Sequence, residues 1–313
     1  MNMETLRKEA RLLMEVPLKP VQGTRFQPTG FPDLGAATYQ DPDGRSMLLV
    51  ESAQSMANRL EAVCWDDASQ DLVAPLRGLP YIQVTDEKGK ILTNSLLESH
   101  RVNSPYILES ADKNFFTVLS SELGTLDKGR VDLNKLAVTL MKYDVNTLIH
   151  GVFLAKKDLA GGRLRLPRAL SAFVEAADIN TVSSGGVKMD SVNPQGDTKK
   201  GFGHVPFHRD EYTGKIKAYF NLDLAQIRGY RLGKDAEDML ITFALYKINK
   251  LLKDGLRFRT ACDLEVAGPV VVNRPKGFTL PTLEEAEKDL PGLIGKISGQ
   301  FADPRITKVI FKE

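Results

Sequence analysis

The sequence has few cysteines and no long hydrophobic run. Its two cysteines in 313 residues, Cys64 and Cys262, are far apart and each lies in an apolar pattern, which favours reduced core thiols over a disulfide. No apolar run approaches the ~20 residues that a membrane span requires. The charged N-terminal segment, residues 1–10, lacks the apolar stretch of a signal peptide. We therefore expect a soluble, cytoplasmic protein with no membrane partner.

The sequence also lacks a large net charge, because 42 Lys and Arg nearly balance 40 Asp and Glu to give +2. Acidic residues nevertheless outnumber basic ones over 61–126: Glu61, Asp66, Asp67, Asp71, Asp86, Glu87, Glu98, Glu109, Asp112 and Glu122. Basic residues dominate 156–217: Lys156, Lys157, Arg163, Arg165, Arg168, Lys188, Lys199, Lys200, Arg209, Lys215 and Lys217. This asymmetry predicts one acidic and one basic face, which suits a subunit that packs head to tail on a polyanion.

A catalytic or metal-binding constellation is missing as well. His204 and His208 have i, i+4 spacing, but Pro206 between them excludes a helical zinc motif and no glutamate follows His204. Asp190 is an isolated carboxylate without a second Mg²⁺ ligand nearby, and no serine stands at a G-x-S-x-G elbow. Gly201-Phe202-Gly203 resembles only part of a nucleotide fingerprint. We therefore predict no catalytic residue, no metal site and no cofactor.

The clearest pattern that is present is a short strand followed by a helix over residues 47–64. Met47 to Val50 is an apolar run of strand length, and Ser52 offers an N-cap hydroxyl. The apolar residues then follow helical spacing: Ala53, Met56, Ala57, Leu60, Val63 and Cys64. The opposite face carries short polar groups and one cation: Ser52, Gln54, Ser55, Asn58 and Arg59. Such a face suits a helix N-terminus that binds a phosphate chain, and an ordinary capped helix on a sheet fits the same residues.

The rest of the chain predicts one elaborated domain, 1–313, in which helices and strands alternate. We expect helices over 4–15, 95–101, 112–121, 131–143, 235–253 and 282–290, and a loop over 21–46 with a hairpin turn at 41–44. We expect strands at 81–84 and 90–93, which pair as a hairpin, and at 146–155, 163–179, 215–222 and 256–266. Counted from the strand at 47–50, this order approximates βαββαβ, the ferredoxin-like or RRM-like plan of the α+β class. Residues 61–145 form a helical and irregular insertion in that plan.

Three segments contain cations among small or apolar residues. Lys156, Lys157, Arg163, Arg165 and Arg168 surround Gly161-Gly162, where bare backbone can approach a phosphate. Arg101 lies among small polar residues in 99–104. The segment 180–214 is too rich in Gly, Pro, Ser and Asn for core, and its flanking strands favour a protruding β-ribbon. It carries Lys188, Lys199, Lys200 and Arg209 beside Met189, Val192, Phe202 and Phe207. This mixture fits single-stranded nucleic acid, and a solvated loop with a few hydrophobic anchors fits it too.

Five motifs together resemble one known family. They are Val50–Glu61 (VESAQSMANRLE), His150–Ala155 (HGVFLA), Arg163–Glu175 (RLRLPR and its continuation), Ser184–Lys188 (SGGVK) and Gly201–Arg209 (GFGHVPFHR). The set is similar to the RAMP-superfamily backbone subunit (Cas7-like, Csb1 family) of type I-U, also called I-G, CRISPR effector complexes. The similarity extends over roughly residues 25–280.

The resemblance implies an RRM-like palm with a protruding β-hairpin thumb at about 180–214. It implies that several copies stack head to tail along a CRISPR guide RNA, together with other effector-complex subunits. Each thumb inserts into the guide, and target DNA is recognised through the guide. The resemblance also implies a scaffold rather than an enzyme, because cleavage in such systems belongs to a recruited nuclease.

The resemblance maps RNA-binding candidates onto this sequence. The helix after the first strand, where related subunits grip the guide phosphates, maps to Ser52, Gln54, Ser55, Asn58 and Arg59. The thumb contributes Lys188, Met189, Phe202, His204, Phe207, His208 and Arg209. The remaining candidates are Arg101, Arg163, Arg165 and Arg168, and strand alternation places Arg163 and Arg165 on one face.

Two other functions fit parts of the sequence. Related backbone subunits of type III systems cut target RNA with a single acidic residue. The first alternative is therefore a metal-dependent ribonuclease of the same fold, acting at Asp190 or at the His204 and His208 pair. The second is a small-molecule-binding α+β protein, which predicts a monomer without bound RNA.

Overall fold

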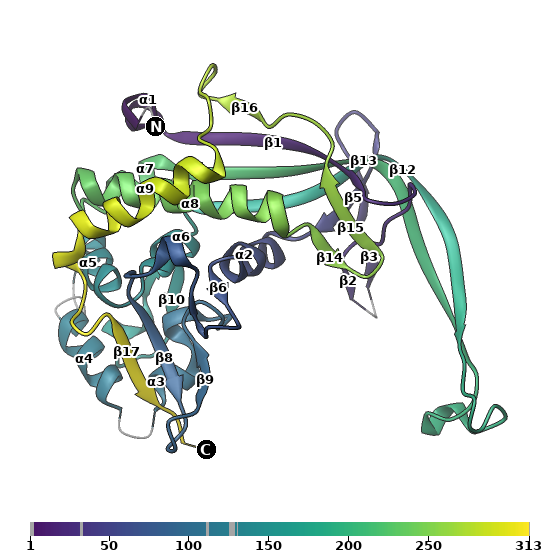
Figure 1. Ribbon diagram of the computed structural model, residues 1–313, viewed down its shortest axis with the longest axis horizontal. Coiled ribbons are helices and arrows are strands. Elements are labelled where there is room, and N and C mark those ends of the chain that lie inside the picture. Colours follow the sequence, from purple (N-terminus) through teal and green to yellow (C-terminus); the bar gives the residue numbers. More distant parts are fainter. Residues whose placement is uncertain (1–2, 32–33, 111–112, 125–128, 130, 313) are drawn as a thin grey trace.

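The computed structural model describes residues 3–31, 34–110, 113–124, 129 and 131–312. Figure 1 shows a sheet with helices along one side, an insertion at one end and a long hairpin at the other. Within the described residues, no helix is long and apolar enough to cross a membrane.

The central sheet has eight strands in the described part of the chain, and its paired strands run antiparallel. They are β1 (Arg11–Pro20), β4 (Thr38–Gln40), β5 (Ser46–Glu51), β12 (Leu170–Lys188), β13 (Val205–Asp223), β14 (Arg257–Arg259), β15 (Cys262–Val266) and β16 (Val271–Arg274). Their order is β14-β15-β1-β13-β12-β5-β4, and β16 also pairs with β1. Along β1, Leu12, Met14, Val16 and Leu18 are buried and alternate with half-buried residues. This period of two directs one face of the sheet towards the helices.

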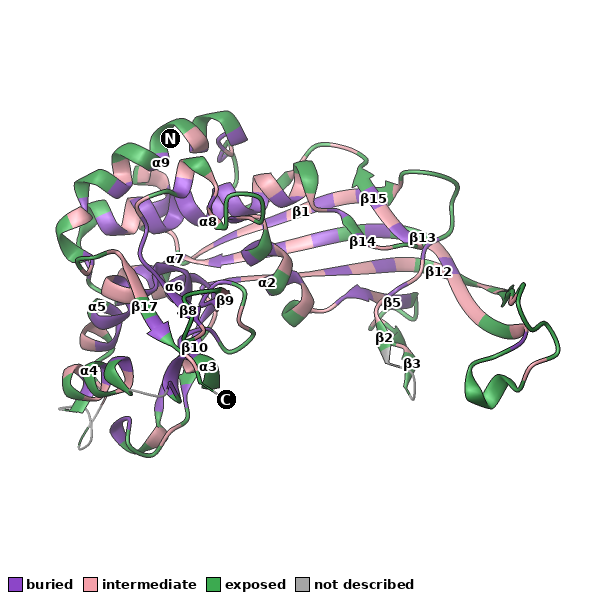
Figure 2. Ribbon diagram, turned by 60° about the horizontal axis from the view of Figure 1, so that its bottom comes forward, coloured by how far each residue is buried: buried purple, intermediate pink, exposed green. Residues whose placement is uncertain are grey.

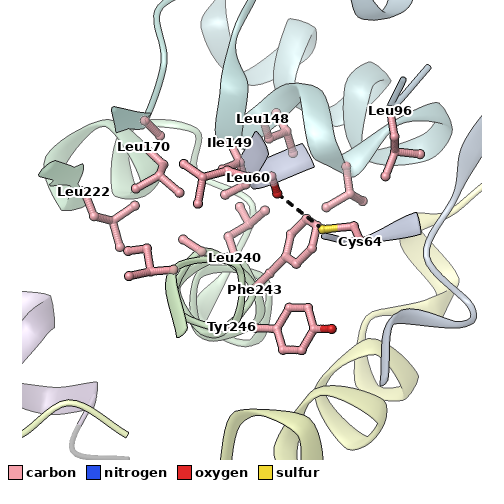
Figure 3. Packing of buried hydrophobic residues seen from close by; sticks show 14 of the residues in the cluster. Leu60, Cys64, Leu96, Leu148, Ile149, Leu170, Leu222, Leu240, Phe243 and Tyr246 are labelled. Carbon is pink, nitrogen blue, oxygen red and sulfur yellow. Dashed lines mark hydrogen bonds between the residues drawn. The ribbon is translucent and has the colours of Figure 1, made fainter. Parts of the chain in front are cut away.

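The core lies between that face and the helices. The helices along it are α2 (Ala53–Ala62), α7 (Leu224–Gly229), α8 (Lys234–Asp254) and α9 (Leu283–Lys296), preceded in the chain by α1 (Met3–Lys8). In Figure 3, Leu240 and Phe243 of α8 point towards Leu60 of α2 and towards Cys64, and all four side chains are buried. α8 contacts α2, α6, α7 and α9, so it is the centre of the helical packing.

The chain between α2 and β12 contains nearly all of the insertion predicted over 61–145 and continues to residue 166; we call this whole segment the insertion. Its elements are β6 (Trp65–Asp66), β7 (Asp71–Leu72), η1 (Ala74–Leu76), β8 (Tyr81–Thr85), β9 (Ile91–Asn94), η2 (Arg101–Asn103), α3 (Pro105–Leu108), α4 (Asn114–Leu123), α5 (Leu133–Tyr143), α6 (Val145–His150), β10 (Val152–Leu154), η4 (Ala160–Gly162) and β11 (Leu164–Leu166). The C-terminal strand β17 (Ile306–Ile310) returns to it and pairs with β8 in parallel. The short elements β2 (Gly30–Phe31), β3 (Gly35–Ala36), η5 (Thr198–Lys200) and η6 (Ser298–Gln300) complete the fold.

The hairpin is formed by β12 and β13, which stay paired from Leu170↔Leu222 out to Lys188↔Val205. Past its last pairs with β5, at Ala177, and with β1, at Ile216, the ribbon projects away from the rest of the molecule (Figure 1). We call its outer part, residues 180–214, the arm and the segment 189–204 at its end the tip. Figure 2 shows that the outer arm is largely exposed.

The mixed α+β class predicted from the sequence is confirmed. The structure also contains the predicted strand and helix at 47–64, the hairpin at 81–94 and the helices at 131–143, 235–253 and 282–290, as β5, α2, β8, β9, α5, α8 and α9. The helix expected over 112–121 corresponds to α4, and residue 112 lies outside the described residues.

The helix predicted over 4–15 is wrong beyond Lys8. Residues 11–20 form β1 instead, because the apolar residues from Leu12 onwards recur at every second position. β1 lies inside the sheet, between β15 and β13, whereas the strand order predicted from the sequence starts at residues 47–50. Those residues belong to β5, which lies beyond β12.

The strand predicted over 146–155 is also wrong at its start. Residues Val145–His150 form α6, because the Asp144 carboxylate caps this segment by accepting from the Asn146 N–H at 3.1 Å. Gly151, at φ +77°, then ends the helix, and only β10 is extended. The strand predicted over 163–179 is two strands, β11 and β12, with Pro167 between them.

Two smaller differences concern turns. The helix predicted over 95–101 is a turn followed by η2, because the Asn94 side chain accepts from the Leu96 and Leu97 N–H groups and stabilises a turn there. The strand predicted over 256–266 is the hairpin of β14 and β15.

Candidate nucleic-acid interface

The N-terminal half of α2 presents the polar face that the sequence predicted. The Ser52 hydroxyl accepts from the Ser55 N–H at 3.2 Å and caps the helix. Met56, Ala57 and Leu60 are buried beneath it, whereas Gln54 and Asn58 are exposed. α2 lies between the insertion and the arm in Figures 1 and 2.

Arg168 joins this face from a distant part of the chain. Its guanidinium donates to the Gln54 side-chain oxygen and, at 3.4 Å, to the Ala53 carbonyl. The Gln54 amide donates in turn to the Asn58 side-chain oxygen at 2.8 Å. A cation, two amides and the start of a helix are thus connected on one exposed surface, an arrangement that favours an anion.

A pair of cations, Arg59 and Arg259, lies around the buried carboxylate of Glu51 at the end of β5. The Ser55 hydroxyl and both Arg59 and Arg259 donate to that carboxylate, Arg59 Nε at 3.1 Å. Arg59 also donates to the Phe258 carbonyl at 2.7 Å and stacks over the Phe258 ring at 4.7 Å. Two guanidinium groups share one carboxylate, so this cluster retains a net positive charge.

Sequence reasoning missed Glu51 and Arg259 in this cluster. The alternation of Arg257 and Arg259 along one strand was the available signal. The contact itself depends on the position of β14 and β15 relative to β5, which the sequence pattern does not contain.

The base of the arm holds a cavity of about 490 Å³. It is lined by Arg259 and by the predicted residues His208 and Arg209, together with Tyr212 and the segment 27–30. His208 Nε2 lies 3.3 Å from the Asp210 carboxylate. The cavity therefore continues the cationic surface from α2 towards the arm.

The tip presents apolar side chains to solvent. Met189 is 82% exposed and Phe202 54% exposed, and Lys188 and Phe207 on the neighbouring strands are also exposed. His204 lies within the tip, where its Nδ1 accepts from the Asp190 N–H at 3.0 Å. The structure thus separates His204, in the tip, from His208, beside the cavity at the base.

Arg101 is not part of an exposed surface. It is buried and forms a two-point ion pair with Glu61, with Nε to Oε1 at 2.6 Å and Nη2 to Oε2 at 2.8 Å. Its guanidinium has no free path to a phosphate in the chain as folded, and we remove it from the interface.

Arg163 and Arg165 are both exposed and flank the buried Leu164. Arg165 stacks over the Phe153 ring at 4.8 Å, and Arg163 donates to the Gly129 carbonyl at 2.8 Å. They lie at the β10–β11 hairpin of the insertion.

Across the described residues, no group of three or more His, Cys, Asp or Glu side chains is placed to hold a metal ion. The fold and this surface define a class: a mixed α/β protein with an antiparallel sheet, a long projecting hairpin and a cationic surface between hairpin and insertion.

The chain belongs to the family of CRISPR-associated protein GSU0053 (Cas_GSU0053), whose model matches residues 12–181, more than half of its length. Among solved structures it is similar to a chain of a CRISPR RNA-guided surveillance complex, pre-nicking, at 12% identity and a TM-score of 0.42, covering 92% of this chain and 89% of that one. It is also similar to Csc2 of Thermofilum pendens, at 11% identity and a TM-score of 0.32, covering 94% and 79% of the two chains. No curated protein sequence matches it.

Proposed function

We propose that this chain is a backbone subunit that binds CRISPR guide RNA in a type I-U (I-G) effector complex. Membership of a CRISPR-associated family supports a role in a CRISPR system. The observation that carries the RNA-binding role is the exposed start of α2, where Gln54, Asn58 and Arg168 are linked in one chain of hydrogen bonds. Such groups suit phosphate and sugar oxygens and bind RNA without sequence preference.

In this proposal β1, β12, β13 and β15 with α2 and α8 form an RRM-like palm. The strand order β15-β1-β13-β12 supports it, because two helices connecting four antiparallel strands in that order is the ferredoxin-like plan. The arm is the thumb, and RNA that follows α2 runs between the thumb and the insertion. Copies stack head to tail on the guide, target DNA pairs with the guide, and other effector subunits complete the complex.

The proposal is tested by introducing a negative charge at the start of α2 in Gln54→Glu. A glutamate in the first turn is favourable for the helix and retains the oxygen that accepts from Arg168. A loss of RNA binding by this variant therefore does not arise from a weakened fold. We expect its affinity for single-stranded RNA of guide length to fall by about tenfold or more, and the slope of log K against log salt to become shallower.

The matched control is Gln300→Glu, the same chemical change at an exposed residue of η6. It should bind RNA like the wild type. A wild-type protein that purifies as an RNA-free monomer and ignores added guide RNA contradicts the proposal and favours the small-molecule alternative. RNA of defined length that co-purifies with a multimer supports the proposal.

We also propose that the subunit is a scaffold without catalytic activity. Both oxygens of the Asp190 carboxylate accept from backbone N–H groups, which supports this view. Incubating the RNA-bound assembly with complementary target RNA and Mg²⁺ or Mn²⁺ tests it. Cleavage that disappears in Asp190→Ala contradicts the scaffold role.

A further inference from the structure

The tip of the arm is folded around one carboxylate. Asp190 Oδ1 accepts from the Val192 N–H at 2.8 Å and the Asn193 N–H at 3.0 Å, and Oδ2 accepts from the Gly203 N–H at 2.8 Å. The Asp190 N–H donates to His204 Nδ1 at 3.0 Å. These bonds join the start of the tip to its end. The three N–H bonds to the carboxylate lower the pKa of the Asp190 carboxyl below its ordinary value, with the bond from Asn193 as the largest cause.

Backbone contacts in the middle of the tip close it further. The Phe202 N–H donates to the Asp197 carbonyl at 3.1 Å, and the His204 N–H donates to the Pro194 carbonyl at 3.2 Å. Gly203 has φ +83°, and a Cβ there would lie 2.4 Å from the Gly196 carbonyl oxygen. The tip is thus a closed loop with a defined shape, in contrast to a loop that samples many conformations.

This loop fixes the positions of three exposed apolar side chains. Met189 precedes Asp190 directly and is 82% exposed, Val192 donates its N–H to the carboxylate and is 93% exposed, and Phe202 precedes Gly203 and is 54% exposed. Apolar side chains with this exposure gain nothing from the fold and are available for a partner.

We propose that Asp190 is a positioning residue for RNA binding. Its carboxylate is the internal template of the tip and holds Met189, Val192 and Phe202 where they meet the bases of the guide. The inference rests on the proposed function for the identity of the partner. The role of Asp190 in ordering the tip depends only on the hydrogen bonds described above.

The same geometry argues against a metal at Asp190. Three N–H donors point at its two oxygens, so a cation would have to displace them or share the oxygens with three partial positive charges. The carboxylate of Asp190 is committed to the backbone, as the carboxylate of an Asx turn is.

The experiment compares Asp190→Ala, Asp190→Asn and the control Asp67→Ala, an exposed aspartate of the insertion. In Asp190→Ala we expect hydrogen-exchange protection of the Val192, Asn193 and Gly203 amides to be lost, while the global unfolding midpoint stays that of the wild type. Affinity for guide-length RNA should fall about tenfold, the loss of about one stacking contact. Asp190→Asn keeps an oxygen for two of the three donors. Its amide protection and RNA affinity should lie between those of the wild type and those of Asp190→Ala.

A double-mutant comparison with the apolar residues distinguishes a positioning role of Asp190 from a simple loss of charge or of local order. Met189→Ser with Phe202→Ser should weaken RNA binding in the wild type and add little in the Asp190→Ala background. Unchanged amide protection in Asp190→Ala overturns the template. If the losses in RNA-binding free energy from Asp190→Ala and from Met189→Ser with Phe202→Ser are fully additive, the positioning role is overturned. A wild type that does not bind RNA refutes the proposed function, and the exchange measurement still tests the template.

Discussion

The buried ion pair of Arg101 and Glu61 yields the sharpest prediction of the structure. The Arg101 side chain is 7% exposed and that of Glu61 4% exposed. Besides its two bonds to Glu61, Arg101 donates to the Gly151 carbonyl at 3.4 Å, and Glu61 also accepts from Asn146 at 2.6 Å. The pair therefore connects α2, η2 and the end of α6.

Arg101→Met retains an apolar stem of similar length but leaves the Glu61 carboxylate buried with a single side-chain donor, Asn146. Removal of one partner of a buried ion pair costs about 3–5 kcal/mol. The free energy of unfolding of a whole domain is about 5–15 kcal/mol, so the loss is a large part of the total. Glu61→Leu should also be destabilising, since it leaves the Arg101 guanidinium buried without its ion-pair partner.

The double variant Arg101→Met with Glu61→Leu removes both charges and should recover most of the loss. We expect a coupling energy above about 2 kcal/mol, measured by urea unfolding of the four proteins. The double variant should also bind guide-length RNA like the wild type. The reasoning is refuted if Arg101→Met unfolds at the wild-type urea concentration yet binds RNA more weakly, because Arg101 would then act at the interface.

Three further predictions follow from buried groups. Burial raises the pKa of Asp144 from 3.8 to about 6, so the wild type should gain stability relative to Asp144→Asn as pH falls from 7 to 4, by on the order of 3 kcal/mol in unfolding free energy. A pH-independent difference between the two contradicts it. Gly151→Ala should lower the thermal midpoint by several degrees, because φ is +77° and a Cβ would lie 2.6 Å from the Leu166 carbonyl oxygen; an unchanged melting curve contradicts this. Burial raises the pKa of Cys262 to about 11 and also raises that of Cys64, so neither thiol should react with a thiol reagent at pH 8 until the protein unfolds; a native protein that reacts contradicts the packing.

The sequence was sufficient to predict an element where its apolar residues keep one spacing along the whole element. Helices α5 and α8 and the β5–α2 unit were predicted in place, because their apolar residues follow one spacing throughout. β1 was missed because residues 4–8 are helical and the period changes to two within the same short segment. The order of strands in the sheet depends on pairing across long separations, which local spacing does not encode.

The residues of the candidate site also divide into those that local spacing predicts and those that only long-range pairing brings together. Gln54, Asn58 and Arg59 follow from the face of one helix, so the sequence placed them together. Glu51 and Arg259 meet only because distant strands are brought side by side. Arg101 lies among small polar residues, a setting typical of an exposed cation, and its carboxylate partner comes from a helix 40 residues earlier.

The last strand of the chain has a consequence for the order in which the protein forms. β17 pairs with β8, so residues 306–310 complete a sheet whose other strands are made more than 200 residues earlier. During synthesis the three-stranded sheet β17-β8-β9 is complete only after residues 306–310 have been made, while β1, β12 and β13 of the central sheet can already pair. Deletion of residues 306–310 would therefore leave β8 without its parallel partner, far along the chain from the residues removed.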